Sequence, residues 1–235
     1  MMHDALVWQL VDSAFPTGAF AHSLGLESAW QHGEVVSRDD LRRFVEATIL
    51  QAASGALPLV NAVHGEPSRL AELDALNDAF LTNAVANRAS RQQGRTLVAS
   101  AARIFASSTL DALLARVSST SNSQSPTPKA LPTPNLCAHA APMTGVVCAA
   151  LGVSLETTQR VVLFVAARGV LSAAVRLGVT GSYDAQRLQS ECAGWSATVL
   201  ARYRDAGPAD LAQTAPLIDI LQGAHDRLYS RLFQS

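Results

Sequence analysis

The sequence predicts an all-α fold, a single-domain bundle of about eight to ten helices. Three observations support this fold class. Apolar residues recur at helical spacing in most of the chain, and strict alternation over the length of a strand is absent. No internal repeat is apparent that would indicate a solenoid. With 235 residues, of which 49% are hydrophobic, the chain can bury one sizeable core.

The first strongly periodic segment follows Ser37. Ser37 and Asp40 resemble a capping box in which Asp replaces the usual Glu. This spacing predicts a helix with one buried face, formed by Leu41, Phe44, Val45, Thr48, Ile49 and Ala52. Two similar faces follow, Leu73, Leu76, Phe80 and Leu81 in one helix and Leu97, Ala101, Ile104 and Phe105 in the next.

The helical pattern is interrupted once. Residues 118–135 are rich in Ser, Thr, Pro and Asn, and prolines within this segment forbid a regular helix. We expect a flexible loop inside a single domain that spans residues 1–235; an interdomain linker is the alternative. After it, Ser154 is expected to cap a helix through Val162, Val165, Gly169 and Ala173. Pro216 suits the first turn of a last helix, expected to bury Leu217, Leu221, Leu228 and Leu232.

Composition and charge exclude several classes of protein. The net charge is −1 and no basic stripe is visible, so nucleic acid is not an expected partner. The most apolar stretch, Val161 to Val179, contains Arg168 and Arg176, which favours a buried helix over a membrane span. The first ten residues lack the basic region of a signal peptide. Three cysteines without a CxxC pair predict neither a disulfide framework nor a four-cysteine zinc site. We therefore expect a cytoplasmic protein.

Catalytic motifs are missing or incomplete. The single lysine, Lys129, is not part of a P-loop, so the chain is not itself a GTPase of that class. Ala21 to Gly25 approximates the GxSxG elbow, which leaves a serine hydrolase using Ser23 as the alternative function; an ordinary serine at a helix start is the simpler interpretation. Cys137 and His139 are suitable Ni²⁺ or Zn²⁺ ligands, but two ligands alone do not make a site. We expect no catalytic residue, no cofactor and no metal site.

Four segments, in order along the chain, resemble the UreF family of urease accessory proteins. Gln9 to Glu27 is similar to the family's "LxDSxFPxGxFxHSxGLE" string, although many members read tyrosine-serine-glutamine where this chain has His22-Ser23-Leu24. Ser90 to Arg95 is similar to a central helix motif. His139 to Gly145 resembles "HxxPxxG", and His225 to Ser235 resembles the C-terminal "HxxxYSRLFxS".

The resemblance implies a function and partners. It implies an all-α, non-enzymatic scaffold that forms a homodimer and binds a UreD/UreH-type accessory protein on one side and the GTPase UreG on the other. The complex docks on apo-urease, and GTP hydrolysis, whose rate this protein is expected to modulate, is coupled to nickel insertion. Nucleic acid and membranes are not expected partners.

The family motifs and the residue chemistry together give the candidate partner-binding residues. Phe15 to Gly18 reads as a type I turn, and Ser23, Glu27 and Trp30 as one helical stripe. Arg91 and Arg95 could contact acidic groups of a partner or form structural salt bridges. Tyr229 and Phe233 are expected one helical turn apart, docked on a partner or on this domain. The candidates are Phe15, Pro16, Gly18, His22, Ser23, Glu27, Arg91, Gln93, Gly94, His225, Tyr229, Ser230, Arg231, Leu232 and Phe233.

Overall fold

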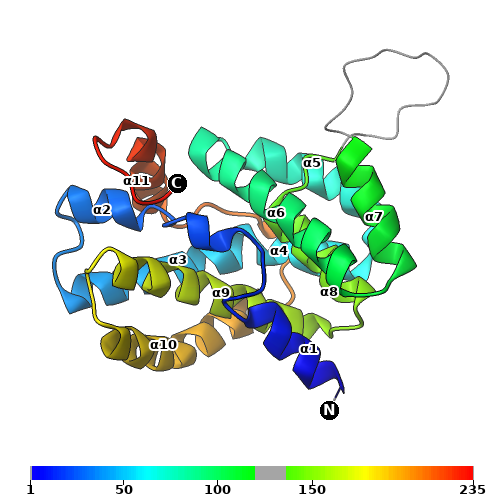
Figure 1. Ribbon diagram of the computed structural model, residues 1–235, viewed down its shortest axis with the longest axis horizontal. Helices are drawn as coiled ribbons and strands as arrows, with labels where there is room; N and C mark the ends of the chain where they lie inside the picture. Colours follow the sequence, from blue (N-terminus) through cyan, green and yellow to red (C-terminus); the bar gives the residue numbers. More distant parts are fainter. Residues whose placement is uncertain (1, 120–135, 235) are drawn as a thin grey trace.

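The computed structural model describes residues 2–119 and 136–234, and within these ranges it contains α-helices and short 3-10 helices but no strand (Figure 1). The all-α prediction is therefore confirmed. The α-helices are α1 (Met2–Val11), α2 (Leu26–Gln31), α3 (Arg38–Gly55), α4 (Leu57–Gly65), α5 (Leu70–Phe80), α6 (Ala84–Ile104), α7 (Ser108–Ser119), α8 (Ala140–Ala150), α9 (Leu155–Arg176), α10 (Ser182–Tyr203) and α11 (Pro216–Ala224).

The helices pack around two main apolar clusters. In the first, α9 lies against α3 and α10, with side chains such as Ile49, Leu163 and Leu188 fully buried (Figure 1). In the second, α4 and α6 pack on α8, and α5 and α7 close the outside. The α4 and α9 helices touch each other, so the two clusters adjoin.

Three helices begin where the capping residues and the proline in the sequence predict. Ser37 and Asp40 form the predicted capping box, in which the Ser37 hydroxyl accepts the N–H of Asp40 and the Asp40 carboxylate accepts the N–H of Ser37. The hydroxyl of Ser154 caps α9 by accepting the N–H of Thr157. Pro216 is the first residue of α11. These three predictions are confirmed.

Two apolar faces and the last helix differ from expectation. Leu76 and Ile104, expected to be buried, are 37% and 43% exposed. The last helix ends at Ala224 and is followed by a 3-10 turn, η5 (His225–Arg227), and by a bent, non-helical segment, so Tyr229 and Phe233 do not share a helical face. Leu217, within α11, and Leu232, beyond it, are 73% and 54% exposed instead of buried. Apolar spacing alone cannot separate a helix from an irregular segment that docks elsewhere.

Three further expectations need correction. At Phe15 to Gly18 the main-chain contact is Thr17 N–H to the Phe15 carbonyl at 2.8 Å, and the tight turn lies three residues earlier, from Asp12 to Phe15. Ser23 precedes α2 instead of lying on it, because Leu24 and Gly25 adopt positive φ values of 56° and 86°. Of the expected loop at 118–135, residues 118 and 119 are the end of α7 and residues 120–135 lie outside the described part of the chain.

The α9 helix is long and apolar enough to cross a bilayer when judged by length and composition alone. Half of its most apolar window, 50%, is buried inside the protein, against α3 and α10. This burial is typical of the central helix of a folded bundle.

Candidate functional site

A buried carboxylate holds the C-terminal end of the described chain. Glu27, in the first turn of α2, accepts the N–H of Leu232 at 2.6 Å and the N–H of Phe233 at 3.1 Å. Its Oε2 also lies 3.0 Å from Nε2 of His225. The side chains of Glu27 and His225 are 2% and 0% exposed. A buried charge needs such partners to be tolerated. We call residues 228–234 the tail, and this set of contacts the tail latch.

The start of α2 is shaped to receive the tail and α11. Gly25 has a positive φ of 86°, and a Cβ atom there would lie 3.2 Å from the backbone nitrogen of Gln222 in α11. Gly25 therefore serves both the left-handed conformation and the close approach of α11. The side chain of Asn83 caps α6 and donates a hydrogen bond to the Asp219 carbonyl, which ties α11 to α6 as well.

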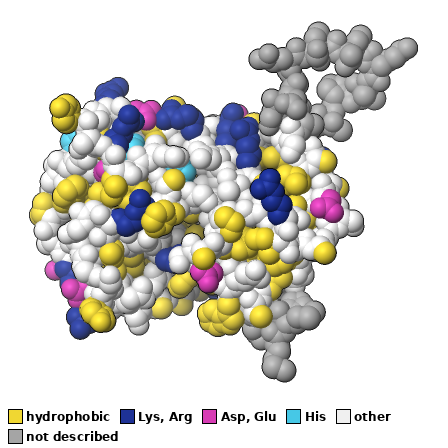
Figure 2. All heavy atoms as spheres, in the orientation of Figure 1, with side chains coloured by type: hydrophobic (Ala, Val, Ile, Leu, Met, Phe, Trp, Pro, Cys, Tyr) yellow, Lys and Arg dark blue, Asp and Glu magenta, His cyan; other side chains and the backbone are white. Residues whose placement is uncertain are grey.

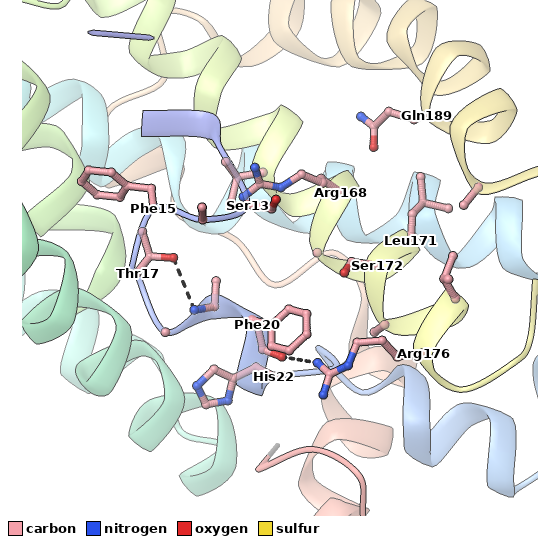
Figure 3. A pocket seen from close by; sticks show the side chains of 18 of the residues that line it. Ser13, Phe15, Thr17, Phe20, His22, Arg168, Leu171, Ser172, Arg176 and Gln189 are labelled. Atoms are coloured by element: carbon pink, nitrogen blue, oxygen red, sulfur yellow. Dashed lines mark hydrogen bonds between the residues drawn. The ribbon is translucent and has the colours of Figure 1, made fainter. Parts of the chain in front are cut away.

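An arginine between two aromatic rings anchors the tail to α9. The guanidinium of Arg176 lies 3.7 Å from the centre of the Phe20 ring and 4.2 Å from that of Phe233. Arg176 also donates to the Phe20 carbonyl, as Figure 3 shows. Cation–π contacts of this kind stabilise by about 0.5–2 kcal/mol. Phe233 is 5% exposed, so this tail aromatic belongs to the chain's own interior.

A cavity of about 450 Å³ lies beside this stack, between the 13–22 segment, α9 and α10 (Figure 3). Its wall includes His22, Arg168 and Phe233. Arg168 donates to the Val11 carbonyl and so fixes the end of α1. Because Phe233 forms part of the wall, the shape of the cavity depends on whether the tail is latched.

The stability of this region is expected to fall below about pH 6.5. Burial, and secondarily the charge of His225, lower the pKa of His22. A histidine whose pKa is depressed in the folded state favours folding above its unfolded pKa of about 6.5 and loses that contribution as the pH falls towards its folded pKa. Urea unfolding at several pH values should show this slope, and His22→Gln should flatten it. An unchanged slope in the variant would assign the pH dependence to another group.

A second buried polar cluster joins α5, α6 and the segment before α8. Asp74, 1% exposed, accepts the N–H of Ala138 at 2.9 Å and of His139 at 2.8 Å. One turn on, Asp78 pairs with Arg91, accepts from Asn87, and lies 3.0 Å from Nε2 of His139. These hydrogen bonds, Arg91 first, hold the pKa of Asp78 far below its usual range.

The structure divides the candidate partner-binding residues into two groups. Pro16, Tyr229, Ser230, Arg231 and Leu232 are exposed, and Gly18, Arg91 and Gln93 are half-buried. Phe15, His22, Ser23, Glu27, Gly94, His225 and Phe233 are buried. In this conformation the buried group shapes the surface from beneath and does not itself offer a contact to another protein.

The structure also decides between the alternative interpretations of Arg91 and of Ser23. Arg91 forms the structural salt bridge that was one of its two interpretations. Ser23 is 0% exposed and lies between η1 (Ala19–Ala21) and α2, with no strand before it in residues 2–22. The strained strand-to-helix turn of a hydrolase elbow is thus not formed, and the hydrolase alternative is not supported.

Sequence reasoning missed Asp74, Asp78, Ser90 as a histidine partner, and Arg176. A signal was present for the first two, because carboxylates at i and i+4 interrupt the apolar pattern of α5. No local signal pairs Asp74 with Ala138 and His139, since these contacts join residues that are 64 and 65 positions apart in the sequence.

Comparison with known proteins identifies the family. The family model described as UreF matches residues 35–193. Urease accessory protein F of Arabidopsis thaliana is 39% identical over 97% of this chain and 91% of its own length. Urease accessory protein F of Oryza sativa subsp. japonica is 37% identical over 96% of this chain and 83% of its own. Urease accessory protein UreF of Arthrobacter sp. (strain FB24) is 30% identical over 97% and 95%. The chain belongs to the UreF family of urease accessory proteins.

Proposed function

We propose that this urease accessory protein is a non-catalytic scaffold in the nickel-loading complex of urease. It joins a UreD/UreH-type protein and the GTPase UreG, docks with them on apo-urease, and modulates GTP hydrolysis by the partner. It acts in the cytoplasm and as a homodimer. The names of the relatives support the accessory role, and the latched tail supports the docking role.

The observation that carries the docking role is that the elements around the latch carry several exposed apolar side chains. Trp30 in α2, Leu217 and Ile220 in α11, and Tyr229 and Leu232 in the tail are 42%, 73%, 66%, 105% and 54% exposed. These elements touch one another, and the Gln31 side chain donates to the Ser230 carbonyl. We call these five side chains the tail surface. Clustered exposed apolar side chains commonly mark protein interfaces.

Arginines border the tail surface and would orient an approaching partner by their charge. Arg88 and Arg231 both pair with Asp226, at 2.7 and 3.7 Å. Figure 2 shows arginine side chains spread along the upper edge of the molecule in this view instead of in one dense patch. A partner with an acidic rim around an apolar centre would fit such a surface, because rim charges steer association.

The role itself is tested by activating urease with and without the chain. Apo-urease is co-expressed with its other accessory proteins, and urease activity and nickel content are measured. We expect both to fall to background without this chain and to return with it. Full activity in its absence would overturn the proposal. The purified chain alone is expected not to hydrolyse GTP, whereas it should change the GTP turnover of UreG in the assembled complex.

Tyr229→Ala and Phe233→Ala should separate docking from folding. Tyr229 is fully exposed, so its loss should leave the thermal melt unchanged. If Tyr229 anchors the interface, the affinity for the UreD/UreH-type partner should fall by at least about tenfold. Phe233 is buried against Arg176, so its loss should lower the free energy of unfolding by about 3 kcal/mol. A pull-down paired with a melt gives both readouts. Unchanged binding by Tyr229→Ala would place the interface elsewhere.

A further inference from the structure

We propose that Asp78, Cys137 and His139 form a binding site for one divalent transition-metal ion, Zn²⁺ or Ni²⁺. The site lies where the end of α5 meets the residues that precede α8. It is separate from the tail latch, and it does not depend on the proposed scaffold function, because it can be tested on the isolated chain.

The ligand atoms already converge. One oxygen of Asp78, the sulfur of Cys137 and a ring nitrogen of His139 lie within 4.8 Å of one another. Metal–ligand bonds of about 2.0–2.3 Å place ligand atoms somewhat closer than this, so small side-chain movements suffice. A carboxylate, a thiolate and an imidazole together suit Zn²⁺ and Ni²⁺ and leave further positions open. His139 is buried, whereas Asp78 and Cys137 are half-buried, so an ion can enter from their side.

The backbone around the ligands is held in an uncommon conformation. Ala138, between the two ligands, has a φ of +64°, which a residue with a Cβ atom rarely adopts. Asp74 fixes it by accepting the N–H groups of both Ala138 and His139. The left-handed residue lets Cys137 and His139, two positions apart, converge on Asp78. Strain of this kind persists only where its surroundings determine it.

The other atoms of the ligands are also supported. Nδ1 of His139 lies 3.1 Å from the Ser90 hydroxyl, which in turn accepts the N–H of Ala140. With a metal on Nε2, the ring proton would reside on Nδ1 and be donated to Ser90. Metal-bound histidines usually have such a partner on the other nitrogen. Arg91 and Asn87 orient the Asp78 carboxylate.

The charges of the cluster favour a dication. The carboxylates of Asp74 and Asp78 and the guanidinium of Arg91 leave one net negative charge on the metal-free cluster. Binding of a dication with loss of the thiol proton to solvent brings the cluster to neutrality.

Three features oppose binding and limit the affinity. Burial, then Asp74 and Asp78, raise the pKa of the Cys137 thiol, so the ion must displace its proton. Arg91 competes for Asp78, and Nε2 of His139 must exchange its contact with Asp78 for the metal. We therefore expect a reversible site whose occupancy follows metal availability.

The test uses the purified, reduced, metal-free chain. Every sample carries His3→Ala, because a histidine at the third position can chelate Ni²⁺ with main-chain nitrogens. Titration with Ni²⁺ and with Co²⁺, a probe for Zn²⁺ sites, should give a thiolate charge-transfer band that saturates at one ion per chain. Cys137→Ala should remove the band, and Cys192→Ala, a buried cysteine of α10, should retain it. Ser90→Ala should lower the affinity by about 10–100-fold.

A second measurement needs no variant in the site. Bound Zn²⁺ should protect Cys137 from alkylation, mapped by mass spectrometry, and leave the modification of Cys148 and Cys192 unchanged. Thermal melts check that Cys137→Ala remains folded. Absence of the band, a band that persists in a folded Cys137→Ala variant, or equal alkylation of Cys137 with and without Zn²⁺ would each overturn the site, and would leave the urease-activation test of the scaffold untouched.

Discussion

Glu27→Ala is expected to release the tail and to lower the free energy of unfolding by about 3 kcal/mol. The variant removes the acceptor of two backbone N–H groups and of His225, all in a buried place. Once released, the tail also withdraws Phe233 from Arg176. Hydrogen exchange of the Leu232 and Phe233 amides should rise to the rate of open chain, and urea unfolding gives the loss of stability.

The matched control is Glu34→Ala, an exposed glutamate shortly after α2. Its effect on stability should be within about 0.5 kcal/mol, as for most surface substitutions. If the Leu232 and Phe233 amides stay protected in Glu27→Ala, the tail is held chiefly by the aromatic stack and the latch is secondary. In urease activation, Glu27→Ala should behave like loss of the tail, since the tail surface loses two of its five side chains.

Gly94→Ala, which adds one methyl group to α6, is expected to disrupt the packing of α6 strongly. A Cβ atom at Gly94 would lie 2.1 Å from the Ala138 carbonyl oxygen and 2.8 Å from the His139 carbonyl carbon. Both neighbours are backbone held by Asp74, so neither can turn away. The α6 helix must then separate from the start of α8, which should cost about 3 kcal/mol or more and much of the soluble yield.

Gly194→Ala provides the control for Gly94→Ala. Gly194 is also inside a long helix, α10, but a Cβ atom there meets nothing within 4 Å. This variant should be more stable than the original chain by about 0.5–1 kcal/mol, because alanine loses less backbone entropy in a helix. Chemical unfolding of the two variants side by side makes the comparison. Equal stabilities would mean that α6 and the Ala138 segment shift apart without penalty.

The sequence predicts those parts of the fold whose causes are local. The capping box at Ser37, the cap at Ser154 and the proline that begins α11 each act within one turn, so residue type and spacing suffice. The family motifs also drew attention to Glu27 and His225. Their pairing could not be predicted, because a glutamate in a first helical turn is usually solvated, and only the arrival of the tail buries it.

The second polar cluster shows the same limit more sharply. Cys137 and His139 stand out in the sequence as two possible ligands, and two do not make a site. The third, Asp78, lies on α5, and its position depends on how α5 packs on α8. The helical prediction for Tyr229 to Phe233 was wrong for a related reason: apolar spacing alone does not show that Glu27 captures the backbone of this segment in a bent, non-helical form.

The tail latch joins parts of the chain that are synthesised far apart in time. Glu27 and His225 are separated by 198 positions. Closing so long a loop is entropically costly and comes late in folding, after local helices have formed. A nascent or truncated chain that lacks residue 233 would therefore present neither the aromatic stack nor the ordered tail surface. The latch thus makes the tail surface depend on the meeting of two distant segments, since a partner that binds this surface would engage only chains in which α2 has already captured the tail.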